Sequence, residues 1–300
     1  NLVDNIQKEY KKEFAMSSLC IKTNNENILN YLQNEFKEFN MLNVFFSFNE
    51  FKSYKNIIIH YKGIDNELFY TKIATILSYL VIDCFEYDFI ENILKTNYFY
   101  FSNLEFTKIL NFATENLCDD NEFSFQNRQI LLFDAFYEYI ITHHSIVLTG
   151  FINFRLSKYR NLLEELVDLS VNEYIIEREY TEFISLLKLY VSSEPSLTHI
   201  VHIISFDDNT FLLDENLNII DIDKNALNAK YLSDVSFSNN DYILNTLLNL
   251  LPRKIFIHLV SSSNNLEFIE TLKLIFNGRI ELCTDCNICN LYKSLNIQHK

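Results

Sequence analysis

The longest regular pattern in this chain is a run of apolar residues from about Ser157 to Val191. These residues recur every three to four positions, which places them on one side of an α-helix. The members of the stripe are Tyr159, Leu162, Leu163, Leu166, Val167, Tyr174, Phe183, Leu187 and Tyr190. A helix with so broad an apolar side gains most of its stability from packing against other elements. We therefore expect it to be central to the packing of the protein.

The segment SSEPSL, which follows this helix, is the clearest boundary in the chain. Pro195 cannot continue a helix, and its polar neighbours favour a loop. Beyond it, the runs THIVHIISF, TFLLDEN and LNIIDID predict a meander of three strands, because Asp and Asn between them favour turns. A helix NDYILNTLLNLL, a strand KIFIHLV, a helix NLEFIETLKLIF capped near Gly278, and a strand RIELC complete the region. The last three elements predict a βαβ unit with parallel strands.

The first hundred residues alternate between strand and helix patterns. SSLCIKT predicts a strand, ENILNYLQNEFKEF a helix, and LNVFFSFNEFKSYKNIIIHYKG two further strands that end at Gly63. The next segment, NELFYTKIATILSYLVIDCFEYDFIENILK, predicts a long helix or a broken pair of helices packed on this small sheet. From about Tyr98 to Ser193 the pattern stays helical, with breaks around CDDNE and THHS.

These patterns together predict an α+β protein with three regions. Residues 1–97 form a small N-terminal βαββ unit with long helices. Residues 98–194 form a helical middle that holds the central helix. Residues 195–300 form a C-terminal α/β unit with the meander and the βαβ element, and this unit ends in a cysteine-rich segment.

The segment ELCTDCNICN places Cys283, Cys286 and Cys289 within seven residues. Cysteines at this spacing can curl their thiolates around one metal centre, so we expect zinc or an iron–sulfur cluster here. The spacing supplies three ligands, and His258 on the neighbouring strand, His299 in the tail, Asp285 or an exogenous molecule could provide the fourth. No proline follows the last cysteine, so the bacterial ferredoxin pattern is not matched. A redox-active dithiol pair and a set of unrelated thiols are the alternatives.

Composition argues against several classes of function. The net charge of −15, from 40 acidic and 25 basic residues without a basic patch, opposes binding to nucleic acid or anionic lipid. No uncharged apolar window of 18 residues occurs, and the first residues lack the apolar core of a signal peptide, so we expect neither a membrane span nor export. Cys20, Cys84 and Cys118 have apolar neighbours, which predicts buried free thiols in a reducing cytoplasm.

The three glycines, at positions 63, 150 and 278, exclude two common nucleotide-binding motifs. Neither a GxxxxGK[ST] phosphate loop nor a GxGxxG dinucleotide turn can be built from them. The sequence also lacks the GxSxG and HExxH patterns of two large hydrolase classes.

Weaker candidates have simpler structural interpretations. Glu173 and Glu177 lie one turn apart on the central helix, but no histidine lies at the spacing that a metal site would need. We therefore favour a solvent-exposed acidic face, stabilised locally by an ion pair between Arg178 and Glu182, over a metal or acid–base site. His60 and His202 lie in apolar strand runs and are interpreted as core residues.

One stretch resembles a known family. The segment GFINFRLSKYRNLLEELVDLSVNEYIIEREYTEFISLLKLYV, followed by HIVHII, resembles the YtxC-like family of sporulation proteins from spore-forming Firmicutes. The family-like positions are Phe154, Arg155, Leu156, Tyr159, Glu179, Tyr180, Phe183, Ile184, Leu187, Val201, His202 and the tail cysteines. Family tails follow a CxGCxxC pattern, whereas Asp285 replaces the glycine here and would stiffen the turn.

The resemblance implies a link to sporulation without an assigned reaction. We expect a cytoplasmic, non-enzymatic protein that binds a protein partner, with Arg155, Tyr159, Arg178 and Glu179 as candidate contacts and a metal site at the C-terminal cysteines. The charged residues among these candidates could instead cap and stabilise the helix, and we favour that structural role. The alternative function is an iron–sulfur or thiol redox protein, or an enzyme, that uses Cys283, Cys286 and Cys289.

Overall fold

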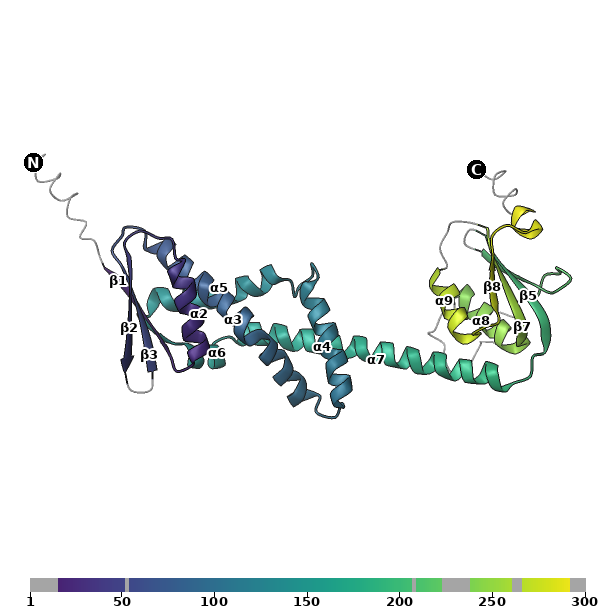
Figure 1. Cartoon of the computed structure of the whole chain (residues 1–300), viewed down its shortest axis with the longest axis horizontal. Helices are drawn as coiled ribbons and strands as arrows, with labels where there is room; N and C mark the ends of the chain where they lie inside the picture. Colours follow the sequence, from purple (N-terminus) through teal and green to yellow (C-terminus); the bar gives the residue numbers. More distant parts are fainter. Residues whose placement is uncertain (1–15, 52–53, 207–208, 223–237, 261–265, 292–300) are drawn as a thin grey trace, which may run out of the picture. The chain divides into compact units, whose positions relative to one another are not determined.

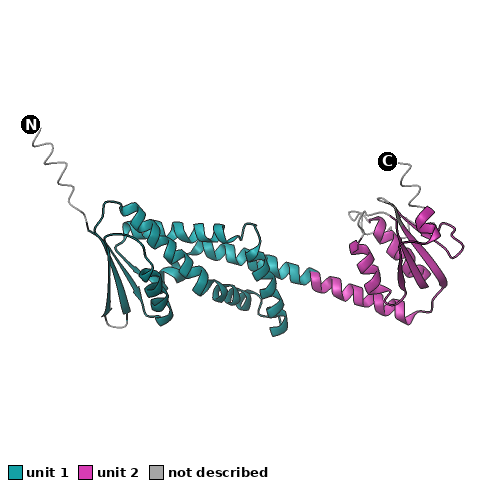
Figure 2. Cartoon of the chain, turned by 45° about the horizontal axis from the view of Figure 1, so that its top comes forward, with its two compact units in different colours: residues 1–176 teal, residues 177–300 magenta. Residues whose placement is uncertain are grey.

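The computed structural model describes residues 16–51, 54–206, 209–222, 238–260 and 266–291 (Figure 1). The chain divides into two compact units, residues 1–176 and 177–300 (Figure 2). Each unit contains its own four-stranded mixed sheet and its own helices, which confirms the α+β class. The first unit draws its core both from the predicted N-terminal region and from the predicted helical middle.

The sheet of the first unit has the strand order β2-β3-β1-β4. Its strands are β1 (Ser17–Thr23), β2 (Val44–Phe51), β3 (Tyr54–Tyr61) and β4 (Ser145–Val147). The pairs β1–β3 and β2–β3 are antiparallel, as a βαββ unit requires, whereas β4 adds to β1 in parallel. Strand β4 was not predicted, because three residues are too few to show alternation within a helical region.

Among its described residues, the first unit also has six helices, and the last of them continues into the second unit. They are α2 (Glu26–Lys37), α3 (Asn66–Asn97), α4 (Asn103–Cys118), α5 (Phe125–Thr142), α6 (Leu148–Phe154) and α7 (Ser157–Ser193). Side-chain caps fix two of the starts: Asn25 caps α2, and Ser102 with Glu105 forms a capping box on α4. The break predicted at THHS is confirmed, because α5 ends at Thr142 and β4 follows.

Only one helix in the described part of the chain, α3, is long and apolar enough to cross a membrane. Many of its apolar residues, among them Phe69, Leu77 and Val81, are fully buried in the core of the first unit, whereas Leu68 is 44% exposed. The core helix of a water-exposed domain meets the same criteria of length and composition. The absence of a membrane span therefore stays a prediction.

A buried polar cluster lies where α3, α5 and α7 meet. Arg128 Nη1 lies 2.9 Å from Glu86 Oε1, and the Tyr159 hydroxyl donates a 2.5 Å hydrogen bond to Glu86 Oε2. All three side chains are buried. Burial raises the pKa of Glu86, although the Tyr159 hydroxyl and the Arg128 charge both act to lower it. Burial also raises the pKa of Tyr159, so the phenol stays a hydrogen-bond donor.

The sheet of the second unit has the strand order β6-β5-β7-β8. Its elements are β5 (Thr198–Phe206), β6 (Asn209–Leu213), α8 (Asn239–Leu250), β7 (Pro252–Leu259), α9 (Leu266–Ile275) and β8 (Ile280–Cys283). The parallel pairing of β7 with β8 around α9 confirms the predicted βαβ unit, and Gly278 adopts a φ of 77° after α9. The predicted meander is shorter than expected: β5 and β6 form a hairpin, and the third run contributes a single bridge from Leu213 to Ile219.

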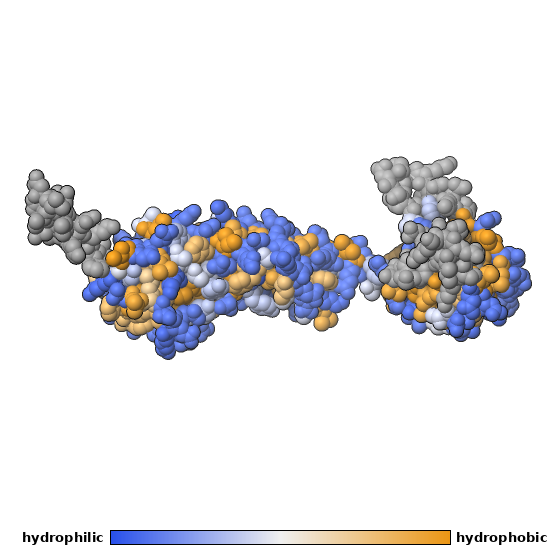
Figure 3. All heavy atoms as spheres, turned by 90° about the horizontal axis from the view of Figure 1, so that it is seen from above, coloured by the Kyte–Doolittle hydropathy of each residue, from blue (hydrophilic) through white to orange (hydrophobic). Residues whose placement is uncertain are grey.

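Helix α7 supplies apolar residues to both cores. Tyr159, Leu163, Leu166, Val167 and Tyr174 are buried in the first core, while Ile184 and Val191 are buried in the second. Two members of the predicted stripe are not core residues, because Phe183 is 53% exposed and Tyr190 is 43% exposed. The predicted pair between Arg178 and Glu182 is present at 3.8 Å. Figure 3 shows that apolar residues are interspersed with polar ones on the surface of the first unit.

The prediction of buried thiols outside the C-terminal cluster is wrong for two of three cysteines. Cys84 and Cys118 are exposed, and Cys20 is half-buried. Both exposed thiols lie on helices, where apolar neighbours in sequence point in other directions around the axis. Apolar neighbours therefore did not indicate burial at these positions.

Candidate metal centre

The candidate metal centre is built at the carboxyl ends of two neighbouring parallel strands. His258 lies near the end of β7, and Cys283 is the last residue of β8 and its register partner. The chain then turns through residues 284–286 into a short helical segment over 287–291. This turn brings Cys286 and Cys289 back over the ends of the strands. The location matches the edge at which parallel sheets commonly bind ligands.

Four donor atoms, from His258, Cys283, Cys286 and Cys289, lie within 4.8 Å of one another. The Sγ atoms of Cys286 and Cys289 are 3.6 Å apart, and those of Cys289 and Cys283 are 3.8 Å apart. Nδ1 of His258 is 3.4 Å from the Sγ atoms of both Cys286 and Cys289. The imidazole and the Cys289 thiol are buried, whereas the other two thiols are half-buried.

These distances match the edges of a tetrahedron around one ion. Zinc binds thiolate sulfur at about 2.3 Å and imidazole nitrogen at about 2.0–2.1 Å, so ideal tetrahedral geometry sets S···S near about 3.8 Å and S···N near about 3.6 Å. Each thiolate of a [4Fe–4S] cluster binds a different iron atom, which requires wider separations between the sulfurs. The geometry therefore favours a single ion with a Cys3His ligand set over such a cluster.

A second histidine orients the first. Nε2 of His258 lies 3.0 Å from Nδ1 of His202 on β5, so one hydrogen bond joins the two rings. When His258 Nδ1 faces the sulfurs as an acceptor, Nε2 carries the proton and donates to His202. Burial lowers the pKa of His258, and the charge of His202 lowers it further, which favours the neutral ring that a metal ligand must be.

The thiols have different acidities. Burial acts to raise the pKa of Cys286, but the backbone N–H of Cys289, 3.4 Å from its Sγ atom, and the neighbouring thiols outweigh it and leave this pKa below its ordinary value. Burial raises the pKa of Cys289 to about 11. A divalent ion deprotonates coordinating thiols outright, so the second value describes the metal-free site.

The remaining predicted ligands are not part of this cluster. His299 lies outside the described residues. Asp285 is exposed in the turn and is not among the four residues whose donor atoms converge. His202 was interpreted from the sequence as a core residue, and the structure instead places it against His258. Its position on a neighbouring parallel strand was the available signal for this contact.

The candidate partner contacts lie on or next to α7, away from the metal centre in the sequence. Arg155 is exposed just before the helix starts, and Glu179 is exposed on it. Arg178 is half-buried and pairs with Glu182. Tyr159 is 1% exposed and bonds to Glu86, so a direct contact with a partner would require the first core to open.

Comparison with known proteins identifies related sequences. The model of the YtxC-like family matches residues 71–281. The chain is 22% identical over 214 residues to the "Uncharacterized protein YtxC" of Bacillus subtilis (strain 168), with 69% of this chain and 74% of that protein covered. No solved structure matches the chain. The family match includes His202 and His258 and ends two residues before Cys283.

Proposed function

The chain belongs to the YtxC-like family, and from this premise we propose that it is a cytoplasmic, sporulation-associated protein that binds a protein partner and holds a structural zinc ion in its C-terminal unit. The observation that carries the metal assignment is the convergence of His258, Cys283, Cys286 and Cys289 at tetrahedral spacing. Neither the exposed thiols of the first unit nor its histidines form a comparable set among the described residues.

A structural role follows from the closed ligand set. Catalytic zinc sites usually keep one position open for water or substrate, whereas four protein ligands occupy every position of a tetrahedral ion. The ion would join the carboxyl ends of β7 and β8 to the terminal turn, which lies beyond the last register pair of the sheet. Its binding free energy would then contribute directly to the stability of this unit.

The partner-binding part is supported by exposed charge on α7 and just before it. Arg155 and Glu179 present charged groups to solvent near the middle of the region matched by the family model. A partner with complementary charges would be attracted and oriented by them. The test compares recovery of partners from sporulating cells by the wild-type chain and by Glu179→Lys. The matched control is Glu215→Lys, which reverses an exposed charge elsewhere. Equal recovery by all three proteins would contradict the role of Glu179.

Metal analysis of anaerobically purified protein tests the zinc assignment. We expect about one zinc per chain and no colour. Cys286→Ser should lose most of the metal, whereas Cys118→Ser, which alters an exposed thiol of the first unit, should retain it. A metal-free wild-type protein would overturn the assignment.

A thiol redox function is the second candidate, because the Sγ atoms of Cys286 and Cys289 lie only 3.6 Å apart. A modest approach of these atoms would form a disulfide and release two protons and two electrons to an oxidant. Titration of free thiols before and after mild oxidation distinguishes the two candidates. Reversible loss of two thiols per chain without bound metal favours redox chemistry, and a brown protein favours an iron–sulfur cluster.

A further inference from the structure

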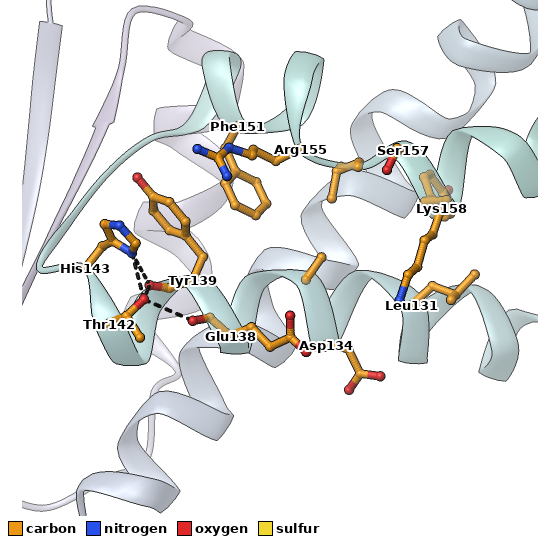
Figure 4. A pocket seen from close by; sticks show the side chains of 13 residues that line it. Leu131, Asp134, Glu138, Tyr139, Thr142, His143, Phe151, Arg155, Ser157 and Lys158 are labelled. Atoms are coloured by element: carbon orange, nitrogen blue, oxygen red, sulfur yellow. Dashed lines mark hydrogen bonds between the residues drawn. The ribbon is translucent and has the colours of Figure 1, made fainter.

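A cavity of about 380 Å³ lies in the first unit, between α5 and the junction of α6 with α7 (Figure 4). Tyr139 of α5 and the buried Phe151 of α6 line its apolar part, with ring centroids 5.0 Å apart in an edge-to-face arrangement. The His143 ring stacks on Tyr139 at 4.2 Å and is fixed by contacts of Nδ1 with the Tyr139 carbonyl and the Thr142 hydroxyl. The cavity therefore has a fixed aromatic wall.

Charges of both signs surround this wall. Arg155 and Lys158 come from the junction of α6 with α7, and Asp134 and Glu138 come from α5, four positions apart (Figure 4). Among the described residues, none of these four side chains forms an ion pair, although they line the same cavity. The four charged groups therefore line one cavity without pairing with one another, the cations on the side of the α6–α7 junction and the carboxylates on α5.

This arrangement selects for a ligand that carries both charges. A simple anion would meet the carboxylates, and a simple cation would meet Arg155 and Lys158, so each would gain attraction on one wall and repulsion on the other. A zwitterion can place its carboxylate beside the guanidinium and its ammonium beside the acidic pair. An apolar side chain on the same molecule would pack on the aromatic wall.

We propose that this cavity binds the zwitterionic group of an α-amino acid with an apolar side chain. A free amino acid and a short peptide whose charged ends lie close together share this chemistry. A neighbouring hollow of about 300 Å³ shares Tyr139, Phe151 and Arg155 and adds the apolar Val147 and Phe154, which gives room for a second residue. The site is independent of the metal centre, because all its residues belong to the first unit.

Calorimetric titration of the full chain with matched ligands tests the proposal. L-Phenylalanine and L-leucine carry both charges, N-acetyl-L-phenylalanine keeps only the carboxylate, and L-phenylalaninamide keeps only the ammonium. We expect at least one zwitterion to bind about three- to tenfold more tightly than either singly charged analogue. Dipeptides of the same residues distinguish the two sources: tighter binding than the free amino acid indicates a peptide, and weaker binding indicates the free compound.

Two variants test the assignment of the charges. Arg155→Gln and Glu138→Gln should each weaken binding of the zwitterion about three- to tenfold. The first should not weaken binding of L-phenylalaninamide, and the second should not weaken binding of N-acetyl-L-phenylalanine, because each substitution removes only a repulsive charge for that analogue. Arg253→Gln, which neutralises an exposed arginine of the second unit, is the matched control and should change nothing.

Two results would overturn the proposal. One is the lack of binding of both zwitterions and their dipeptides at concentrations up to about 10 mM. The other is equal binding of the zwitterion and both singly charged analogues, which would mean that only the aromatic wall contributes. Zinc content is measured on the same samples, so a failure here is separate from a failure of the metal assignment.

Discussion

His258 occupies its position because both of its ring nitrogens have partners. Nδ1 faces the sulfurs of Cys286 and Cys289, and Nε2 faces His202 at 3.0 Å. A ring held at both ends pays little entropy on metal binding, and the hydrogen bond fixes the tautomer in which Nδ1 is free to coordinate. His202 is therefore a positioning residue for the proposed zinc ion.

Removal of this positioning contact should weaken metal binding without abolishing it. We expect His202→Ala to lower zinc affinity about 10- to 100-fold, because partners of ligating histidines typically contribute that much. Competition with a chromophoric chelator measures the affinity. His202→Asn, whose amide oxygen can accept the same hydrogen bond, should recover part of the loss, and His199→Ala, an exposed histidine of the same strand, should have no effect. Equal affinity of all three variants would refute the positioning role.

The polar cluster of the first core depends on the ionisation of Glu86. Burial raises its pKa in the folded state, so the stability linked to this carboxyl group is greatest when it is protonated and falls as pH rises through the folded pKa. The Tyr159 hydroxyl and Arg128 offset part of that loss by stabilising the carboxylate.

Removal of the Tyr159 hydroxyl should therefore destabilise the fold most at pH values above the pKa of Glu86. We expect Tyr159→Phe to lower the free energy of unfolding by about 1–3 kcal/mol at pH 7, because a buried carboxylate loses a donor. The loss should shrink below about pH 4.5, where the carboxyl group is protonated in both states. Urea denaturation at several pH values provides the measurement. Tyr98→Phe, which removes a hydroxyl bonded to Asp168 at the surface, should cost less than about 1 kcal/mol. A loss independent of pH would contradict this account.

At the scale of elements, apolar residues of α7 are buried in some parts of the helix and exposed in others. Leu166 is fully buried in the first core, whereas Leu186 is 66% exposed. Both leucines lie within the same 37-residue helix and have the same intrinsic helix propensity. The difference between them is tertiary contact alone.

Truncation of these two leucines separates packing from helix propensity. Leu166→Ala should lower the free energy of unfolding by about 2–5 kcal/mol, through lost burial and a cavity in the first core. Leu186→Ala should change it by no more than about 0.5 kcal/mol. Thermal and denaturant unfolding of the full chain provide the comparison. A large cost at Leu186 would show that this side chain is covered in solution.

The parallel pair β7–β8 is a short ladder that ends at the proposed metal centre. Its four register pairs end at His258 and Cys283, so the ladder stops where the proposed ligands begin. A short parallel ladder gains little from backbone pairing alone, because parallel pairing is slightly weaker than antiparallel pairing. A shared ion at this end would hold the two strands and the following turn together.

At the scale of the whole molecule, each unit has buried apolar clusters of its own. The core of the first unit adjoins the polar cluster and the proposed amino-acid site, whereas the second unit has a larger core and a small cluster of Ile204, Leu213 and Val260 with Ile288, near the proposed metal centre. Removal of metal should therefore act on one unit and spare the other.

Hydrogen exchange of the full chain before and after chelation tests this separation. We expect faster exchange in β7, β8 and residues 283–291, because the ion stabilises the folded second unit by mass action. Exchange in α3 and α5 should not change, and the same chelator should have no further effect on Cys286→Ser. Faster exchange in both units would show that the metal stabilises the molecule as one body.

Most of the elements could be predicted because their signals are local. The strands of the βαβ unit, the helix α9 and its end at Gly278 follow from apolar periodicity and turn chemistry within a few residues. The approach of the three cysteine sulfurs was also accessible, since they lie within seven residues. Strand β4 and the exposure of Cys84 and Phe183 were missed, because a three-residue strand has no period and a helical pattern does not state which side is covered.

The sequence by itself determined the α+β class, the family and the clustering of three cysteine thiols, because each depends on residues close together in the chain. Only the tertiary structure decided which distant side chains meet. Glu86 bonds to Arg128, which lies 42 positions away in the sequence, and to Tyr159, which lies 73 positions away. His202 bonds to His258, which lies 56 positions away. Such contacts form when sheets and helices pack around a common core, and no periodicity along the chain encodes them.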